Sequence, residues 1–349
     1  MDIRNRIQTF IELGKLLAAF PEHNGSEAQH PLSEAALRAE AFNPWFTQNN
    51  IRYALNSLGE AMRGEKLYEW LVPYKASYER PGYEGKKVGV VTAGNIPLAG
   101  FNDFLSVLLS GNIFCGKLSG QDKILLPAIA SIIESMEPEW NKYFCFTDEP
   151  FRNVDAIIAT GSDNTFRYFE YYFSRYPHII RKNRNGVAVI HGNESSDELS
   201  GLASDVMMYF GLGCRSVSKL FVPRGYDLMK LLPSFEPWND LIRHNKYYNN
   251  YEYQKSIRIV NKQTFFDFGN LLLVEEERLS SPVSVVNFEW YDSLSALSAR
   301  LDDERLNIQC VVSASDPGTD FILPGMAQQP GLGDYADGID TLNFLLNEI

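Results

Sequence analysis

The sequence has few cysteines and no cysteine pair at short spacing. Its 349 residues include only Cys115, Cys145, Cys214 and Cys310, and no two of them form a Cys-x-x-Cys motif. Cysteine pairs at such spacing are the usual signature of a zinc site or a disulfide framework. Their absence predicts a protein without a metal, and it is typical of a chain kept in a reducing cytoplasm.

An apolar run long enough to cross a membrane is also missing, since such a span needs about 20 predominantly apolar residues. Residues 1–20 place Asp2, Arg4, Glu12 and Lys15 among the apolar positions. This mixture predicts an amphipathic helix rather than a signal peptide. We therefore expect a cytoplasmic protein with no membrane span.

The sequence has fewer basic residues than acidic residues. The 32 Lys and Arg residues face 44 Asp and Glu residues, which gives a formal net charge of −12. Such a surface repels the phosphate backbone of nucleic acids, so we expect no nucleic-acid partner. An anionic ligand must be met by a local cluster of donors.

Helices come first in the chain, and short strands then alternate with helices. Residues 1–80 predict helices, because apolar side chains recur at helical spacing. The alternation that follows is typical of parallel, doubly wound sheets. A first set of strands is predicted at 88–92, 112–118, 143–146 and 156–159, and a second set at 187–190, 219–222, 270–274, 283–288 and 309–313.

The predicted fold class is therefore α/β, with two doubly wound lobes after an N-terminal helical segment. We place the helices and the first lobe in residues 1–186, the second lobe in 187–325 and a tail in 326–349. We expect the tail to pack back on the first lobe or on a partner subunit.

Two places in this pattern are candidate sites. Ligands of doubly wound sheets bind beyond the carboxyl ends of the strands, which here carry residues 92–97, 117–121 and 160–163. Separately, Cys214 follows an apolar helical run (residues 202–210) and two glycines that leave open space around its sulfur. A nucleophile needs such space, but a lone cysteine is more often a small buried thiol.

No strand is followed by the Gly-x-Gly-x-x-Gly fingerprint of dinucleotide-binding folds. Five segments together nevertheless resemble the aldehyde dehydrogenase superfamily. Residues 91–97 are similar to its motif ending in Asn-Phe-Pro, residues 111–119 to Gly-Asn…Lys-Pro-Ser, and residues 157–162 to Phe-Thr-Gly-Ser. Residues 211–214 are similar to its Gly-Gln-x-Cys nucleophile turn, and residues 219–222 to the Arg-x-Phe-Val strand after it.

The sequences of residues 93–101 and 211–216 most resemble the acyl-CoA reductase branch of the superfamily, which includes the fatty acyl reductase of bacterial luminescence. This resemblance implies reduction of an acyl-CoA, or another acyl thioester, to an aldehyde with NADPH or NADH. It implies Cys214 as the nucleophile that forms an acyl-enzyme, and Asn95 as a donor to the oxyanion. The residues that it implies as cofactor contacts are Thr92, Lys117, Ser119, Gly161 and Ser162.

Two departures from the oxidising aldehyde dehydrogenases bear on the reaction. Those enzymes carry a catalytic Glu in a Leu-Glu-Leu-Gly-Gly-Lys segment, whereas residues 180–185 here contain no carboxylate. Water should then attack the acyl-enzyme poorly. They also place a Glu after Lys-Pro-Ser, where this chain has Gly120, and its absence permits NADPH. The basic residues of 180–185 suit phosphate groups, although they fit a solvated loop as well.

Two alternative functions stay open: a cofactor-free acyltransferase or thioesterase that uses the same cysteine, and a non-catalytic nucleotide-binding scaffold. His178 and His191 are candidates for proton transfer, although a structural role is more common for a histidine. Tyrosines between residues 247 and 253 fit either a binding site or a surface patch. Since the superfamily commonly pairs through a C-terminal strand, residues 317–349 are the candidate for that role in a homodimer.

Overall fold

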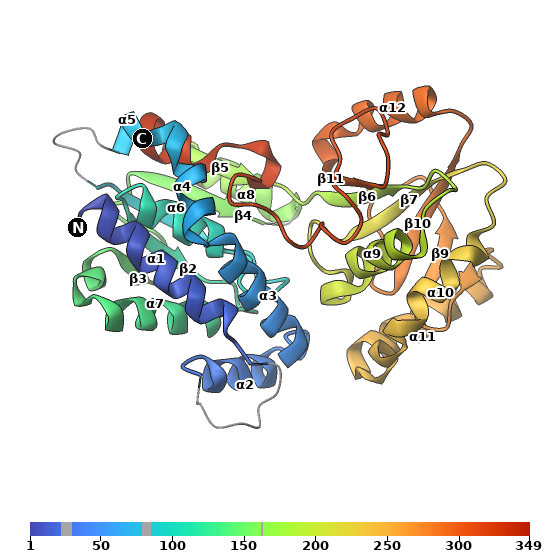
Figure 1. Ribbon diagram of the computed structural model, residues 1–349, viewed down its shortest axis with the longest axis horizontal. Coiled ribbons are helices and arrows are strands. Elements are labelled where there is room, and N and C mark those ends of the chain that lie inside the picture. Colours follow the sequence, from blue (N-terminus) through green and yellow to red (C-terminus); the bar gives the residue numbers. More distant parts are fainter. Residues whose placement is uncertain (22–29, 79–84, 162) are drawn as a thin grey trace. The chain divides into compact units, whose positions relative to one another are not determined.

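The computed structural model describes residues 1–21, 30–78, 85–161 and 163–349, and Figure 1 shows its ribbon. The described residues form two compact units. Unit 1 consists of Met1–Lys182 together with Pro330–Ile349, and unit 2 is Asn183–Gln329. The assignment of cofactor binding and catalysis to such units stays a prediction.

The described part of unit 1 contains a five-stranded parallel sheet with the order β3-β2-β1-β4-β5. The order reverses between β1 and β4, and such a switch point is where doubly wound sheets bind their ligands. The strands are β1 (Lys87–Val91), β2 (Ile113–Lys117), β3 (Phe144–Phe146), β4 (Ala156–Thr160) and β5 (His178–Arg181).

Helices cover one face of this sheet and form the main core of unit 1. They are α1 (Ile3–Ala18), α2 (Ser33–Phe42), α3 (Gln48–Ala61), α4 (Gly64–Leu71), α5 (Lys75–Tyr78), α6 (Phe101–Leu109), α7 (Leu125–Met136) and α13 (Thr341–Asn343). One buried cluster joins Phe10 of α1, Phe104 of α6 and Ile129 of α7 to Phe114 of β2. Helix α1 lies along α3, and a Cβ at Gly59 would come within 2.5 Å of the Ala18 backbone nitrogen (Figure 1). Glycine therefore permits this close helix contact.

The opposite face of the sheet is covered differently. Residues 147–155, all of them described, link β3 to β4 without a helix. The Phe151 ring from this connection lies over the central strand β1, where it would be 2.9 Å from a Cβ at Gly89. Helix α8 (Asp163–Phe173) lies on this face, where it contacts β4 and β5 and packs its Phe169 and Phe173 with Phe151. A loop therefore takes the place of a crossover helix over β1 and β2.

The segment Pro330–Ile349 belongs to unit 1 and is tied to it by hydrogen bonds. Trp70 Nε1 donates to the Tyr335 hydroxyl at 2.8 Å, and Asn112 Nδ2 donates to the Leu345 carbonyl at 3.0 Å. The segment ends in α13 and the π-helical turn Phe344–Glu348. It contains no strand among its residues, all of which are described, and the role of residues 317–349 in a homodimer stays a prediction.

The described part of unit 2 contains a six-stranded sheet with the order β11-β6-β7-β10-β9-β8, in which only the β8–β9 pair is antiparallel. Its strands are β6 (Asn185–Val189), β7 (Val217–Pro223), β8 (Phe266–Asp267), β9 (Leu272–Glu275), β10 (Val285–Tyr291) and β11 (Ile308–Ser313). Its helices are α9 (Ser196–Met207), α10 (Leu232–Phe235), α11 (Asn245–Val260) and α12 (Leu294–Asp303). A capping box between Ser195 and Glu198 begins α9.

The predicted α/β fold with parallel sheets is confirmed. The sequence does not predict strand β5 (His178–Arg181), because Ile180 and Arg181 belong to the basic stretch of residues 180–185. No helix in the described part of the chain is long and apolar enough to cross a membrane.

Candidate active site

A left-handed turn leads from α9 to Cys214. The prediction that the helix continues to residue 210 is wrong, because Tyr209, Phe210 and Gly211 have φ values of 55°, 59° and 73°. This conformation strains side chains with a Cβ and is free only for glycine. The Phe210 ring is buried, 4.6 Å from the His244 ring. We infer that packing of the aromatic side chain compensates for the backbone strain.

Hydrogen bonds on both sides hold the Cys214 turn. Gly213 N donates to Ser216 Oγ at 3.2 Å, and Ser216 N donates to the Gly213 carbonyl at 3.0 Å. Arg215 Nε donates to the Ala327 carbonyl at 2.7 Å. The Cys214 thiol itself is half-buried. It is therefore neither sealed in the core nor on a mobile end of the chain.

A buried carboxylate supports the same region from α9. Asp205 accepts the backbone N–H groups of Gly325 at 2.7 Å and Ala327 at 3.0 Å. Burial raises the pKa of Asp205 to about 6, although these two donors and the nearby Arg215 lower it. Asp205 therefore holds the segment of residues 325–327 in place. The Ala327 carbonyl of this segment accepts the hydrogen bond from Arg215, the residue after Cys214.

The thiol lies at the amino edge of the unit 2 sheet. Cys214 comes just before Val217, the first residue of β7, which pairs with Gly186 near the start of β6. His191 follows the carboxyl end of β6 and contacts Ser313 Oγ through Nε2 at 2.9 Å. Because a strand such as β7 is about 20 Å long, His191 lies at the opposite edge from the thiol. The hypothesis that His191 assists the cysteine is therefore wrong.

In unit 1, hydrogen bonds join the residues at the carboxyl ends of β1 and β2. Thr92 N donates to the Lys117 carbonyl at 3.1 Å, and Ser119 N donates to Thr92 Oγ1 at 3.1 Å. A Cβ at Gly94 would lie 2.4 Å from Ser119 Oγ, so only glycine fits there. The structure therefore brings together Thr92, Lys117 and Ser119, with the buried Thr92 hydroxyl tying the two strand ends.

Asp122 fixes the loop that carries Asn95, and sequence reasoning missed it. Its Oδ2 accepts the N–H of Leu98 at 2.8 Å, and Leu98 has a left-handed φ of 60°. Burial raises the pKa of Asp122 to about 6, against the effect of the Leu98 and Leu125 N–H groups. Asn95 is half-buried and lies three residues before Leu98. The only signal in the sequence was a carboxylate shortly after a strand end.

The remaining predicted cofactor residues follow β4. Gly161 N lies 3.4 Å from the Arg181 carbonyl, and a Cβ at Gly161 would be 2.9 Å from the Phe169 ring of α8. Since β1 and β4 are parallel neighbours, Gly161 and Thr92 share one edge of the sheet. Ser162 lies outside the described residues.

Comparison with known proteins decides the family. The family model described as acyl-CoA reductase (LuxC) matches residues 23–230, which include Asn95 and Cys214. This match covers more than half of the chain. The chain belongs to the acyl-CoA reductase family. Membership places it among oxidoreductases that act on acyl groups and aldehydes. No curated protein sequence matches it.

Solved structures similar to this acyl-CoA reductase family member are aldehyde dehydrogenases. KauB of Pseudomonas aeruginosa is 13% identical, with a TM-score of 0.63 over 92% of this chain and 78% of KauB. The indole-3-acetaldehyde dehydrogenase AldA of P. syringae, solved with NAD+ and IAA, is 13% identical, with a TM-score of 0.62 over 90% and 72% of the two chains. The NAD+ complex of a Bacillus cereus aldehyde dehydrogenase is 13% identical, with a TM-score of 0.59 over 90% and 72%. At this identity they establish the aldehyde dehydrogenase fold.

Several polar groups that the sequence suggested have structural roles in this family member. Arg181 is buried and pairs with Asp103 at 2.7 Å and Thr341 at 2.9 Å, so it is not a phosphate contact. The Tyr247 hydroxyl is buried and donates to the Asn270 carbonyl at 2.7 Å. His178 is exposed and contacts a backbone carbonyl of its own segment.

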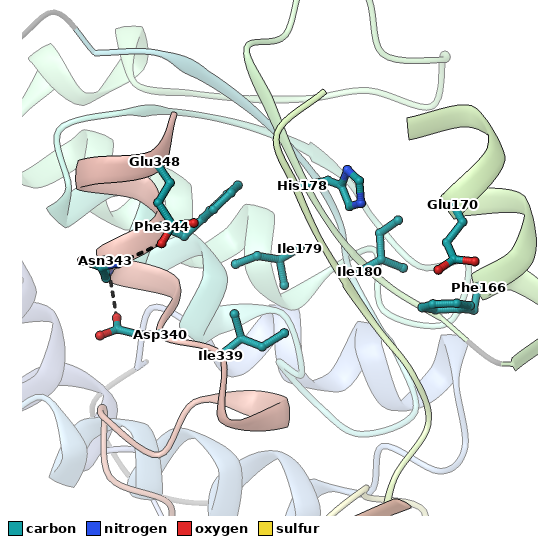
Figure 2. Close-up of a pocket in the computed structure, with 10 residues that line it drawn as sticks. All are labelled: Phe166, Glu170, His178, Ile179, Ile180, Ile339, Asp340, Asn343, Phe344 and Glu348. Carbon is teal, nitrogen blue, oxygen red and sulfur yellow. Dashed lines mark hydrogen bonds between the residues drawn. The ribbon is translucent and has the colours of Figure 1, made fainter. Parts of the chain in front are cut away.

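A cavity of about 350 Å³ lies in unit 1, lined by residues of α8, β5 and the C-terminal segment. Figure 2 shows Ile179 of β5 pointing toward Phe344, whereas Ile180 and His178 point toward α8. His178 lines this cavity, whereas Asn95, Cys214 and the predicted cofactor contacts do not. It is therefore distinct from the carboxyl-edge cluster around Thr92 and Ser119.

Proposed function

We propose that this protein reduces an acyl-CoA, or another acyl thioester, to an aldehyde with NADPH or NADH. The observation that carries the proposal is the half-buried Cys214, on a hydrogen-bonded turn that follows the left-handed residues 209–211, in a chain of the acyl-CoA reductase family. A cysteine positioned in this way can be approached by a thioester carbonyl, which a buried core thiol cannot.

In the proposed first step, the Cys214 thiolate attacks the thioester carbonyl. The carbonyl carbon gains a bond to Sγ, the original carbon–sulfur bond breaks, and the leaving thiolate takes up a proton. Asn95 Nδ2 and the Cys214 backbone N–H donate to the oxyanion, and each such donor contributes a few kcal/mol. An acyl-enzyme is left on Cys214.

The residues at the carboxyl edge of unit 1 fit a nucleotide. They lie at the switch point of a doubly wound sheet, and no atom lies within 4 Å of a Cβ at Gly120. We assign Lys117 and Ser119 to the ribose, Thr92 to the same cofactor site, and Gly161 and Ser162 to the pyrophosphate at the start of α8. A bound nicotinamide would supply a hydride to the acyl carbon, whose bond to Cys214 Sγ then breaks, so that an aldehyde is released and the cysteine is restored.

The test is mass spectrometry of the reduced protein after exposure to acyl-CoAs of graded length. We expect one acyl adduct, on Cys214, and release of an aldehyde when NADPH is added. Cys145 is the internal control, because it is exposed and would be labelled first if accessibility alone decided the reaction. Cys214→Ala should lose the adduct, and Asn95→Ala should slow the reaction by roughly 100-fold.

Three outcomes separate this proposal from the alternatives. Continued release of CoA, beyond one equivalent per Cys214 and without oxidation of NADPH, would indicate a transferase or thioesterase. An adduct spread over several cysteines would remove the catalytic role of Cys214. Full biological activity of Cys214→Ala would indicate a scaffold that only binds nucleotide.

A further inference from the structure

Two cysteines that are 30 positions apart in the sequence lie side by side in the sheet of unit 1. The register of the parallel pair β2–β3 places Cys115 directly opposite Cys145. Neighbouring strands are about 4.8 Å apart, which is within the range of Cα separations that disulfides span. Both residues are free thiols.

The two thiols share one face of the sheet. Phe114 and Phe144, the residues just before them, pack on the α6 side, with ring centroids 5.0 and 6.0 Å from that of Phe104. Because successive side chains of a strand alternate between faces, Cys115 and Cys145 point to the other side. That side is covered by the loop of residues 147–155 rather than by a helix.

Their surroundings differ in a way that suits a stepwise reaction. Cys115 is 5% exposed. It lies opposite Gly89 of β1 in the strand register, and the Phe151 ring covers that glycine. Cys145 is exposed on the edge strand β3. A small reagent therefore meets Cys145 first, with the second thiol already beside it.

We propose that Cys115 and Cys145 form a redox-active thiol pair that a small disulfide, such as oxidised glutathione, converts into an intramolecular disulfide. Neither thiol belongs to the catalytic residues proposed above, so this inference does not depend on them.

The reaction balances as two thiol–disulfide exchanges. The Cys145 thiolate attacks one sulfur of oxidised glutathione, which breaks its S–S bond, releases one glutathione and leaves a mixed disulfide. The Cys115 thiolate then attacks the Cys145 sulfur and releases the second glutathione. Each cysteine loses one proton, the two cysteine sulfurs are oxidised, and the oxidant is reduced to two thiols.

The second exchange is expected to be slow at neutral pH. Burial, and then the neighbouring Cys145, raise the pKa of Cys115 to about 11, while Lys87 lowers it. Since the thiolate is the attacking form, the rate of ring closure should rise about tenfold for each pH unit below that pKa.

The experiment treats the reduced full-length protein with oxidised glutathione, blocks remaining thiols and maps peptides without reduction. We expect a peptide that links residues 115 and 145, a mass lower by two hydrogens and full reversal by dithiothreitol. Cys145→Ser should leave Cys115 unmodified, and Cys115→Ser should accumulate glutathione on Cys145. A denatured sample is the matched control and should lose the selectivity for this pair.

Accumulation of the mixed disulfide on Cys145 in the wild-type protein, with Cys115 still a thiol at high pH, would overturn the proposal. If Cys115→Ser does not fold, the pH dependence of closure in the wild-type protein still decides. A closure rate that does not change between pH 7 and 9 would show that Cys115 is not the resolving thiol.

Discussion

Replacing Asp122 by Asn should flatten the pH dependence of unit 1 stability. Burial raises the pKa of this carboxyl from 3.8 to about 6. Because the folded pKa is above the unfolded one, the fold favours the protonated acid. That stabilisation is complete below about pH 3.8 and is lost as the pH rises through about 6. The difference between the unfolded and folded pKa values corresponds to roughly 3 kcal/mol of free energy of unfolding.

Asn is neutral at every pH, and its side-chain oxygen can still accept the Leu98 N–H that lies 2.8 Å from Asp122. At pH 4 the variant and the wild-type protein should have similar free energies of unfolding. At pH 7.5 the variant should gain up to about 3 kcal/mol, less whatever the new amide NH₂ loses by burial.

The measurement is amide hydrogen exchange at both pH values, followed on peptides from β1 and β2 and corrected for the intrinsic exchange rate. Asp205→Asn is the matched control, because Asp205 is a buried acid of similar pKa in unit 2 and should change β6 and β7 instead. The reasoning is refuted if Asp122→Asn shifts protection by the same amount at both pH values. It is also refuted if wild-type β1 is equally protected at both.

Two further predictions concern unit 1. Gly120→Glu should weaken binding of NADPH at least tenfold, by repulsion of the 2′-phosphate, and leave NADH binding nearly unchanged. Because Gly120 is exposed, with open space around a Cβ, the fold should tolerate the change. Fluorescence titration with both cofactors, with Gly120→Gln as the control, tests this, and equal weakening of both would contradict it. Arg181→Met should lower the free energy of unfolding, measured by urea denaturation, by about 3–5 kcal/mol, because it leaves the Asp103 carboxylate buried without its partner. Combining it with Asp103→Leu should restore most of the loss, and a cost below about 1 kcal/mol would mean that the ion pair does not stabilise the fold.

The central strands were predictable because they are apolar on both faces. β1, β2 and β4 are buried through most of their length, and their sequences are short runs of Val, Ile, Ala, Gly and Phe. The cluster of Thr92, Lys117 and Ser119 was also predictable, since parallel strands place their carboxyl ends at one edge. Strand β5 was not, because an edge strand needs little apolar character and Arg181 pairs with Asp103, 78 residues earlier.

Register and tertiary packing supplied what sequence patterns could not. The spacing of Cys115 and Cys145 gives no hint that they are opposite each other, because only the β2–β3 register brings them together. The same holds for Phe210, whose left-handed conformation conflicts with the helical pattern of the residues before it. Packing against His244, the N-cap residue of α11, overrides that local preference.

The two candidate sites follow different rules of the α/β fold. Thr92, Lys117 and Gly161 lie at the carboxyl edge of the unit 1 sheet, as expected for ligands of doubly wound sheets. Cys214 lies at the amino edge of the unit 2 sheet, on a helix-to-strand connection that this rule does not select. The prediction of Cys214 as a site residue therefore depended on the glycine–cysteine motif. In the structure, this motif follows a strained left-handed turn at residues 209–211, which packing of the Phe210 ring holds in place. A search for the group that protonates the leaving thiol should accordingly begin among side chains at the amino edge of unit 2, since His191 lies at the other edge.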